Sequence, residues 1–295
     1  MGVLSRILVA TDFSAGAGAA VTRAGQLAQE HHAELHLIHA SPDWNLFSRV
    51  LPAQQGHYST LTEFAESAMQ REVAWLEQKF AIRVRGAVEL GGATRTIARA
   101  AQEFQPQLLV IGARGEHGPS VAASALGGTA LKLLSQTTRP LLLVRDAGAH
   151  PYAEAMAAIS DASEIAKRMV QWGMLVAPSA VWHIVRAYDV PYLERLRQCG
   201  IDDAAMISRA AESRASAQRE IDTVIKAAEH TSPMHVHLMP GEPLRVVLTQ
   251  VVRERVHLLV VGKHAEGIAD TGHGLVGSVG FRLAYHAQGD VLVVP

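Results

Sequence analysis

The chain has little of several features that define common protein classes. Its 295 residues include one cysteine, Cys199, which excludes an internal disulfide and a thiolate metal cluster. No apolar run approaches the roughly 18 residues of a membrane span. The first six residues also lack the charged-then-apolar layout of a secretory signal. We therefore expect a cytoplasmic protein with no membrane contact.

Neither sign of charge dominates, because 27 Lys and Arg residues face 28 Asp and Glu residues. A protein that binds nucleic acid usually carries a basic stripe, so no nucleic-acid partner is expected. The patterns of common catalytic sites are missing as well. The chain has neither a Gly-x-Ser-x-Gly elbow nor a His-Glu-x-x-His pair, although it contains 15 histidines. No metal site and no hydrolase triad are expected.

What the chain does contain is one glycine signature, repeated after 150 residues. In each copy an apolar run ends on a glycine, and a second glycine motif follows fifteen residues later. The candidate residues of these motifs are Gly112, Gly115, Gly127, Gly128 and Thr129 in the first copy, and Gly262, Lys263, Gly277, Ser278 and Val279 in the second. A glycine at a strand end lets the backbone approach a ligand, because no Cβ intervenes. The N–H groups at a helix start favour an anion. Each copy is therefore a candidate phosphate site.

Short apolar runs alternate with helical segments in both halves. The expected strands are 6–10, 34–40, 84–90, 106–111 and 139–144, then 154–159, 180–187, 235–239, 256–261 and 290–294. Such alternation predicts parallel strands with helices on both faces, which is a doubly wound α/β sheet. The length fits two domains of about 150 residues. A small-residue segment at 146–151 places their boundary between domains 1–148 and 149–295.

The local patterns predict where helices start and where a ligand binds. Ser14 is expected to cap the helix after the first strand. Residues 41–59 are interpreted as a loop, and helical spacing predicts a helix over 61–80 whose apolar stripe, Phe64, Ala68, Val73, Trp75 and Leu76, packs in the core. Ligands of such sheets bind at the carboxyl ends of the strands. Asp12 and Gly112 both follow strands, so we expect them to lie together.

These motifs resemble the universal stress protein family. The resemblance rests on Val9-Ala10-Thr11-Asp12-Phe13-Ser14, Gly112-Ala113-Arg114-Gly115 and Leu126-Gly127-Gly128-Thr129, and in the second half on Ser160-Asp161, Gly241-Glu242-Pro243 and the run from Val261 to Val279. It covers the whole chain, which is therefore similar to a tandem member. It implies two five-stranded parallel sheets of order 3-2-1-4-5, related by a pseudo-two-fold axis through paired fifth strands. That arrangement is an intramolecular pseudo-dimer, and the resemblance also allows a homodimer.

The resemblance implies that each half binds ATP or a related adenine nucleotide, with or without Mg²⁺. In the first half Asp12 would contact the adenosine, Ile38 and Ala40 would flank the base, and the glycines with Thr129 would surround ribose and phosphates. Arg114 would be a charged phosphate partner. The corresponding residues of the second half are Asp161, Gly262, Lys263, Gly277, Ser278 and Val279.

Both copies depart from the family pattern, in which nine residues separate the second glycine from the third. Eleven residues lie between Gly115 and Gly127, although a frame shifted to Gly118 and Gly128 restores nine. The unshifted frame is preferred, because the second copy aligns to it at constant offset. The second copy has Ala265 where a glycine belongs, and a methyl group there obstructs close approach. We therefore favour the first half as the nucleotide site.

The leading hypothesis is a stress-response protein that binds an adenine nucleotide and acts through conformation or through an unknown protein partner. No general base and no Walker-type lysine is evident, so we expect at most slow ATP hydrolysis. The alternative is a nucleotide-free tandem scaffold that binds a protein partner or an apolar small molecule. An enzyme that activates a substrate with ATP is a third class, but no catalytic constellation supports it.

Overall fold

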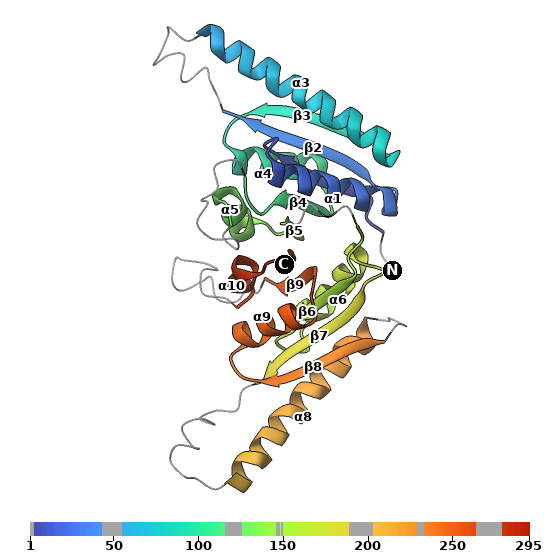
Figure 1. Cartoon of the computed structure of the whole chain (residues 1–295), viewed down its shortest axis with the longest axis vertical. Helices are drawn as coiled ribbons and strands as arrows, with labels where there is room; N and C mark the ends of the chain where they lie inside the picture. Colours follow the sequence, from blue (N-terminus) through green and yellow to red (C-terminus); the bar gives the residue numbers. More distant parts are fainter. Residues whose placement is uncertain are drawn as a thin grey trace. The chain divides into compact units, whose positions relative to one another are not determined.

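The computed structural model describes residues 3–42, 55–115, 126–145, 148, 150–188, 203–228, 233–263 and 279–295. The chain divides into two compact units, Met1–His150 and Pro151–Pro295 (Figure 1). The sequence placed the boundary at residue 148, within the segment that connects the last strand of the first unit to the second unit. We call these parts unit 1 and unit 2.

Unit 1 is a five-stranded parallel sheet of order β3-β2-β1-β4-β5. Helices α1 and α3 pack together on one face, and α4 and α5 pack together on the other (Figure 1). The elements are β1 (Arg6–Thr11), α1 (Ala15–His31), β2 (Glu34–Ser41), α3 (Gln55–Phe80), β3 (Val84–Leu90), α4 (Ala93–Phe104), β4 (Leu108–Gly112), α5 (Gly128–Gln136) and β5 (Leu141–Val144).

Unit 2 repeats this architecture in the order β8-β7-β6-β9-β10. Its elements are β6 (Glu154–Ala158), α6 (Glu164–Val176), β7 (Val181–Tyr188), α8 (Asp203–Ala227), β8 (Met234–Pro240), α9 (Pro243–Arg253), β9 (Leu258–Gly262), α10 (Val279–His286) and β10 (Asp290–Val294). The predicted 3-2-1-4-5 order is confirmed in both units. The pseudo-two-fold relation between them, with paired fifth strands, stays a prediction.

The central strands are buried on both sides, as continuous apolar runs predict. Ile7 and Val9 of β1, and Leu108 and Val110 of β4, are inaccessible to solvent. The predicted cap is confirmed, because the Ser14 hydroxyl accepts the N–H of Ala17 at 3.2 Å. This packing fixes the carboxyl ends of β1 and β4 side by side.

Helix α3 differs from the prediction in two respects. It begins at Gln55 instead of residue 61, so part of the expected loop is helical. The apolar stripe was also only partly right. Phe64 and Trp75 are 62% and 40% exposed, whereas Ala68 and Leu76 are buried. The helix lies over the edge strand β3, where one narrow face is enough to cover the sheet.

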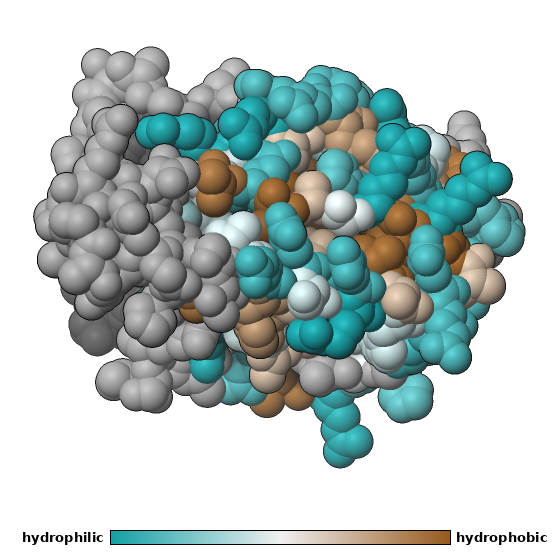
Figure 2. All heavy atoms as spheres, turned by 90° about the horizontal axis from the view of Figure 1, so that it is seen from above, coloured by the Kyte–Doolittle hydropathy of each residue, from teal (hydrophilic) through white to brown (hydrophobic). Residues whose placement is uncertain are grey.

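The surface of the described residues is mixed in character. On the face in Figure 2, hydrophobic residues lie between hydrophilic ones. Among the helices that the structure describes, none is both long enough and apolar enough to cross a lipid bilayer.

Candidate functional site

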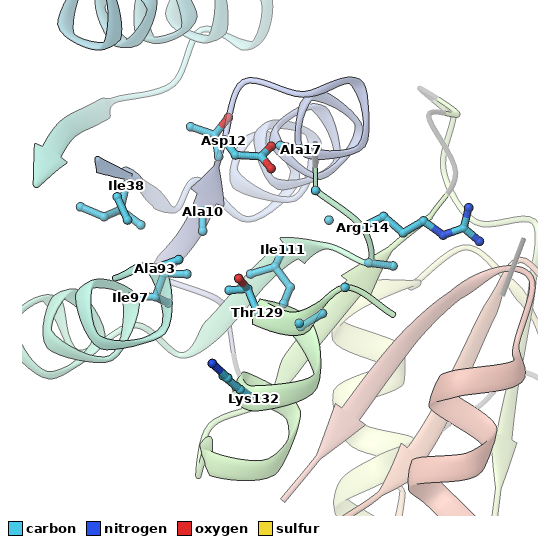
Figure 3. Close-up of a pocket in the computed structure, with 18 residues that line it drawn as sticks. Ala10, Asp12, Ala17, Ile38, Ala93, Ile97, Ile111, Arg114, Thr129 and Lys132 are labelled. Carbon is cyan, nitrogen blue, oxygen red and sulfur yellow. The ribbon is translucent and has the colours of Figure 1, made fainter. Parts of the chain in front are cut away.

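Unit 1 has a cavity of about 380 Å³ at the carboxyl ends of β1 and β4 (Figure 3). Asp12 and Gly112 both line it, which confirms that the topology brings these distant residues together. Its described lining also includes the other site residues predicted for this half: Ile38, Ala40, Arg114, Gly115, Gly127, Gly128 and Thr129. The sequence did not single out Ala17, Ala93, Ile97 or Lys132, which line it as well.

The turn that carries Asp12 is fixed by local hydrogen bonds. Ser14 donates its backbone N–H to Asp12 Oδ1 at 3.1 Å, and its hydroxyl donates to the same oxygen. Phe13 adopts a positive φ of 61° and donates its N–H to the Thr11 hydroxyl at 3.0 Å. Its ring stacks on His39, whose Nδ1 donates to the Thr11 carbonyl at 2.9 Å. Asp12 is therefore held in one orientation at the rim of the cavity.

The loop after β4 passes so close to its neighbours that side chains are excluded. A Cβ on Gly16 would lie 2.7 Å from the Arg114 carbonyl oxygen, and one on Gly112 would lie 2.9 Å from the Gly16 carbonyl oxygen. A Cβ on Gly115 would collide with Asp12 Oδ2. Gly16 was missed from the sequence, although the run of small residues at the start of its helix was the available signal. The close approach places the loop backbone beside the carboxylate.

The start of α5 forms another wall of the cavity. Gly127 donates its N–H to the Ala113 carbonyl at 2.8 Å, so this group is already used, contrary to the role expected of it. The first bond within the helix runs from Leu131 to the Gly127 carbonyl at 3.0 Å. The N–H groups of Gly128, Thr129 and Ala130 consequently have no acceptor among the described residues, as is usual for the first turn of a helix. They can bind an anion.

The opposite end of the cavity is apolar. Ile38 from β2 and Ala93 and Ile97 from α4 lie there (Figure 3), and Ala40 and Ile111 are also in the cavity lining. A cavity with one apolar end, one fixed carboxylate and one end of unpaired N–H groups suits an elongated ligand that has a flat apolar part and an anionic part.

The two positive side chains at this cavity differ in direction. The Arg114 side chain points away from the other labelled residues in Figure 3, so it contributes to the lining near the loop and not beside the start of α5. Lys132 lies one turn into α5, on the same side of the helix as Gly128, and its side chain is exposed. The sequence indicated the first of these cations as a phosphate partner and missed the second.

The corresponding cavity of unit 2 is smaller, at about 180 Å³. The helices α1 and α6 can be aligned on their cap residues, Ser14 and Ser163. In this alignment Ile165 of α6 corresponds to Gly16 of α1, and Met169 corresponds to Ala20. Both side chains pack against the end of β9, because a Cβ on Gly262 would lie 2.8 Å from Ile165 Cγ2 and 2.9 Å from Met169 Sδ. The side chains of α6 thus lie at the end of β9, where in unit 1 the backbone of Gly16 approaches the end of β4.

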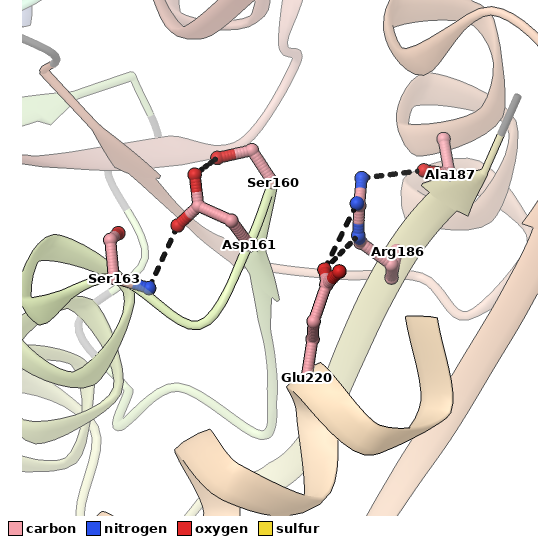
Figure 4. Close-up of polar contacts among 6 residues, drawn as sticks. All are labelled: Ser160, Asp161, Ser163, Arg186, Ala187 and Glu220. Carbon is pink, nitrogen blue, oxygen red and sulfur yellow. Dashed lines mark hydrogen bonds and ion pairs between the residues drawn. The ribbon is translucent and has the colours of Figure 1, made fainter. Parts of the chain in front are cut away.

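Asp161, like Asp12, accepts the backbone N–H of the serine two residues after it, but it lies outside the cavity of its unit. It accepts the Ser163 N–H at 2.8 Å (Figure 4), yet it is not among the described residues that line the unit 2 cavity. The register explains the difference. Val9 pairs with Val110 three residues before Asp12, whereas Ala157 pairs with Val260 four residues before Asp161. The extra residue moves this carboxylate out of the cavity.

Only some of the other site residues predicted for unit 2 line its cavity. Gly262 and Val279 line its cavity, whereas Gly277 and Ser278 lie outside the described residues. Lys263 does not line it, and burial lowers the pKa of its ammonium group. Arg186 lines it but is bound to Glu220 at 3.0 Å and to the Ala187 carbonyl at 2.8 Å (Figure 4).

Comparison with known proteins assigns the family. The model of the universal stress protein family matches residues 4–145, which span the sheet of unit 1. Unit 1 therefore belongs to the universal stress protein family. Among curated proteins, none matches it in sequence.

Solved structures show that the tandem fold extends over the whole chain. A universal stress protein from Archaeoglobus fulgidus is 17% identical with a TM-score of 0.70, and the match covers 98% of this chain and 97% of that one. A putative universal stress protein from Pseudomonas aeruginosa is 16% identical with a TM-score of 0.63, and the match covers 99% and 93%. At these identities the likeness concerns the fold.

Proposed function

We propose that this universal stress protein binds an adenine nucleotide such as ATP in unit 1 and acts in stress response through conformation or through a protein partner. The observation that carries the proposal is the unit 1 cavity, which joins an apolar end, a fixed carboxylate and unpaired helix N–H groups. Its volume of about 380 Å³ lies within the range of roughly 300–1,000 Å³ that is usual for small-molecule sites.

Each part of a nucleotide has a matching wall. The apolar side chains around Ile38 and Ile97 suit the base, the Asp12 carboxylate suits a ribose hydroxyl, and the start of α5 suits the phosphates. A Cβ on Gly128 would meet nothing within 4 Å, which leaves room for a phosphate at this end.

Unit 2 supports a nucleotide less well. Its cavity of about 180 Å³ falls below the usual range for ligand sites, Asp161 lies outside it, and Val279 replaces the Thr129 hydroxyl. We therefore assign the nucleotide to unit 1 and expect no binding in unit 2.

Calorimetric titration with ATP of the wild type, Asp12→Ala and Asp161→Ala tests the assignment. Asp12→Ala should weaken binding by about 1–3 kcal/mol, the usual effect of losing a hydrogen bond to a charged group. Asp161→Ala is the matched control, because it removes the same bond to a cap serine but no cavity wall. If the wild type binds no ATP even at millimolar concentration, the nucleotide-free scaffold replaces this proposal.

A further inference from the structure

The two units differ in the charge placed beside the start of their fourth helix, α5 or α10. In unit 2, Arg282 of α10 forms an ion pair with Glu242 at 3.4 Å. Arg282 corresponds to Lys132 of α5, since each lies twenty residues after the glycine that ends its strand, Gly112 or Gly262. Among the described residues Lys132 has no such partner, because Gly92 stands where unit 2 has Glu242.

The equivalence of Gly92 and Glu242 rests on their surroundings. Each is the N-cap of the helix after the third strand of its unit. Each follows a glycine of positive φ, 140° at Gly91 and 133° at Gly241, whose N–H bonds the carbonyl at the end of the second strand. The Glu242 side chain caps α9 by accepting the Arg245 N–H at 2.9 Å, which keeps its pKa low and its charge in place.

Lys132 is thus a cation that lines the unit 1 cavity with no acidic partner among the described residues. It lies one turn beyond the unpaired N–H groups of α5, on the side that faces α4 (Figure 3). A phosphate chain that starts at these N–H groups and extends outward brings its distal phosphates within reach of a long lysine side chain.

We infer that Lys132 makes the unit 1 site selective for nucleotides with several phosphates; in unit 2 the corresponding cation, Arg282, is paired with Glu242 instead. The inference rests on the proposed nucleotide site of unit 1. A monophosphate is bound at the N–H groups alone, whereas the additional charge of a di- or triphosphate is neutralised by the ammonium group.

The test compares the affinities of ATP, ADP and AMP for the full chain and for Lys132→Gln. The wild type should prefer ATP to AMP, and the variant should lose roughly three- to ten-fold in ATP affinity while its AMP affinity stays the same. Arg282→Gln is the matched control and should change neither affinity. Equal binding of all three nucleotides by the wild type would overturn the inference but leave the nucleotide site intact. Absence of binding would overturn both.

A second variant transfers the ion pair of unit 2 into unit 1. Gly92 has a φ of −74° and open space at its Cβ position, so Gly92→Glu should be accommodated without strain. The new carboxylate should neutralise Lys132 and weaken ATP binding to the same extent as Lys132→Gln. Gly92→Gln, which has the same size without the charge, should bind ATP as the wild type does. Equal losses in Gly92→Glu and Gly92→Gln would show that size, and not charge, matters here.

Discussion

At the scale of single residues, the acidic side chain of Glu72 is the most unusual group near the proposed site. It reaches from α3 to the Thr11 hydroxyl, beside Asp12, and its buried Oε2 has no hydrogen-bond partner within the part of the chain that the structure describes. Burial is the main reason that the pKa of Glu72 is raised above its ordinary value of 4.5, and the charge of Asp12 adds to the effect. The Thr11 hydroxyl opposes it.

This raised pKa predicts a pH-dependent stability. Below pH 4.5 Glu72 is protonated in both the folded and the unfolded chain. As the pH rises, Glu72 ionises first in the unfolded chain, because its pKa is raised in the folded protein. The free energy of unfolding therefore falls until the pH exceeds the pKa of Glu72 in the folded state. Glu72→Gln should therefore be more stable than the wild type at pH 7, with a difference that shrinks towards pH 4.5. Urea unfolding across this range measures it. Glu77→Gln, at an exposed position of α3, should show no such trend, and a constant difference for Glu72→Gln would contradict the account.

Single residues also show how far sequence reasoning carries. Asp12, Gly112 and Gly115 were found because strand ends in a parallel sheet meet at one edge. Lys132 was missed because no local pattern distinguishes a cavity lysine from a solvent-exposed one. The direction of Arg114 likewise depends on how its loop packs.

At the scale of elements, the first turn of α1 sets the size of the unit 1 cavity. Its small residues let the helix approach the β4 loop, whereas α6 fills the same position with Ile165 and Met169. The strands and most helices were predictable from apolar runs. The cavity was not, because its volume depends on which helix residues face the loop.

Two glycines of α1 should respond oppositely to alanine. Gly16→Ala should destabilise the fold by about 1–3 kcal/mol, because its Cβ would lie 2.7 Å from a backbone oxygen that cannot easily move. Gly18→Ala has open space at its Cβ and should stabilise it by about 0.5–1 kcal/mol, the usual gain in a helix. Chemical denaturation of both variants measures the effects. Stabilisation by Gly16→Ala would show that the loop is not held as described.

At the scale of the whole molecule, the chain is one architecture used twice with different sites. Both units have the same strand order, a serine that caps the first helix, and the same glycine turn before α4 or α9. The repeated glycine signature predicted this duplication correctly. The sequence did not show that Asp161 lies outside the unit 2 cavity, since the extra residue before it is visible only from the strand register.

The connection between the units is fastened to unit 1 by Arg23. This arginine is 5% exposed and donates to the His150 carbonyl at 2.8 Å and to the Gly148 carbonyl at 3.0 Å. Arg23→Ala should lower the free energy of unfolding by about 2–3 kcal/mol, because two carbonyls lose charged donors. Arg23→Lys keeps the charge but lacks the planar guanidinium, so its free energy of unfolding should lie between those of the wild type and Arg23→Ala. Thermal unfolding that is unchanged in Arg23→Ala would contradict this anchoring role.

The central claim is that unit 1, and not unit 2, holds a nucleotide. Native mass spectrometry of the full chain with saturating ATP tests it most directly, because it counts the bound molecules. We predict one ATP for each wild-type chain and none for Gly115→Val, whose side chain would collide with Asp12 Oδ2. Two ATP molecules for each chain, or one retained by a folded Gly115→Val variant, would contradict the account.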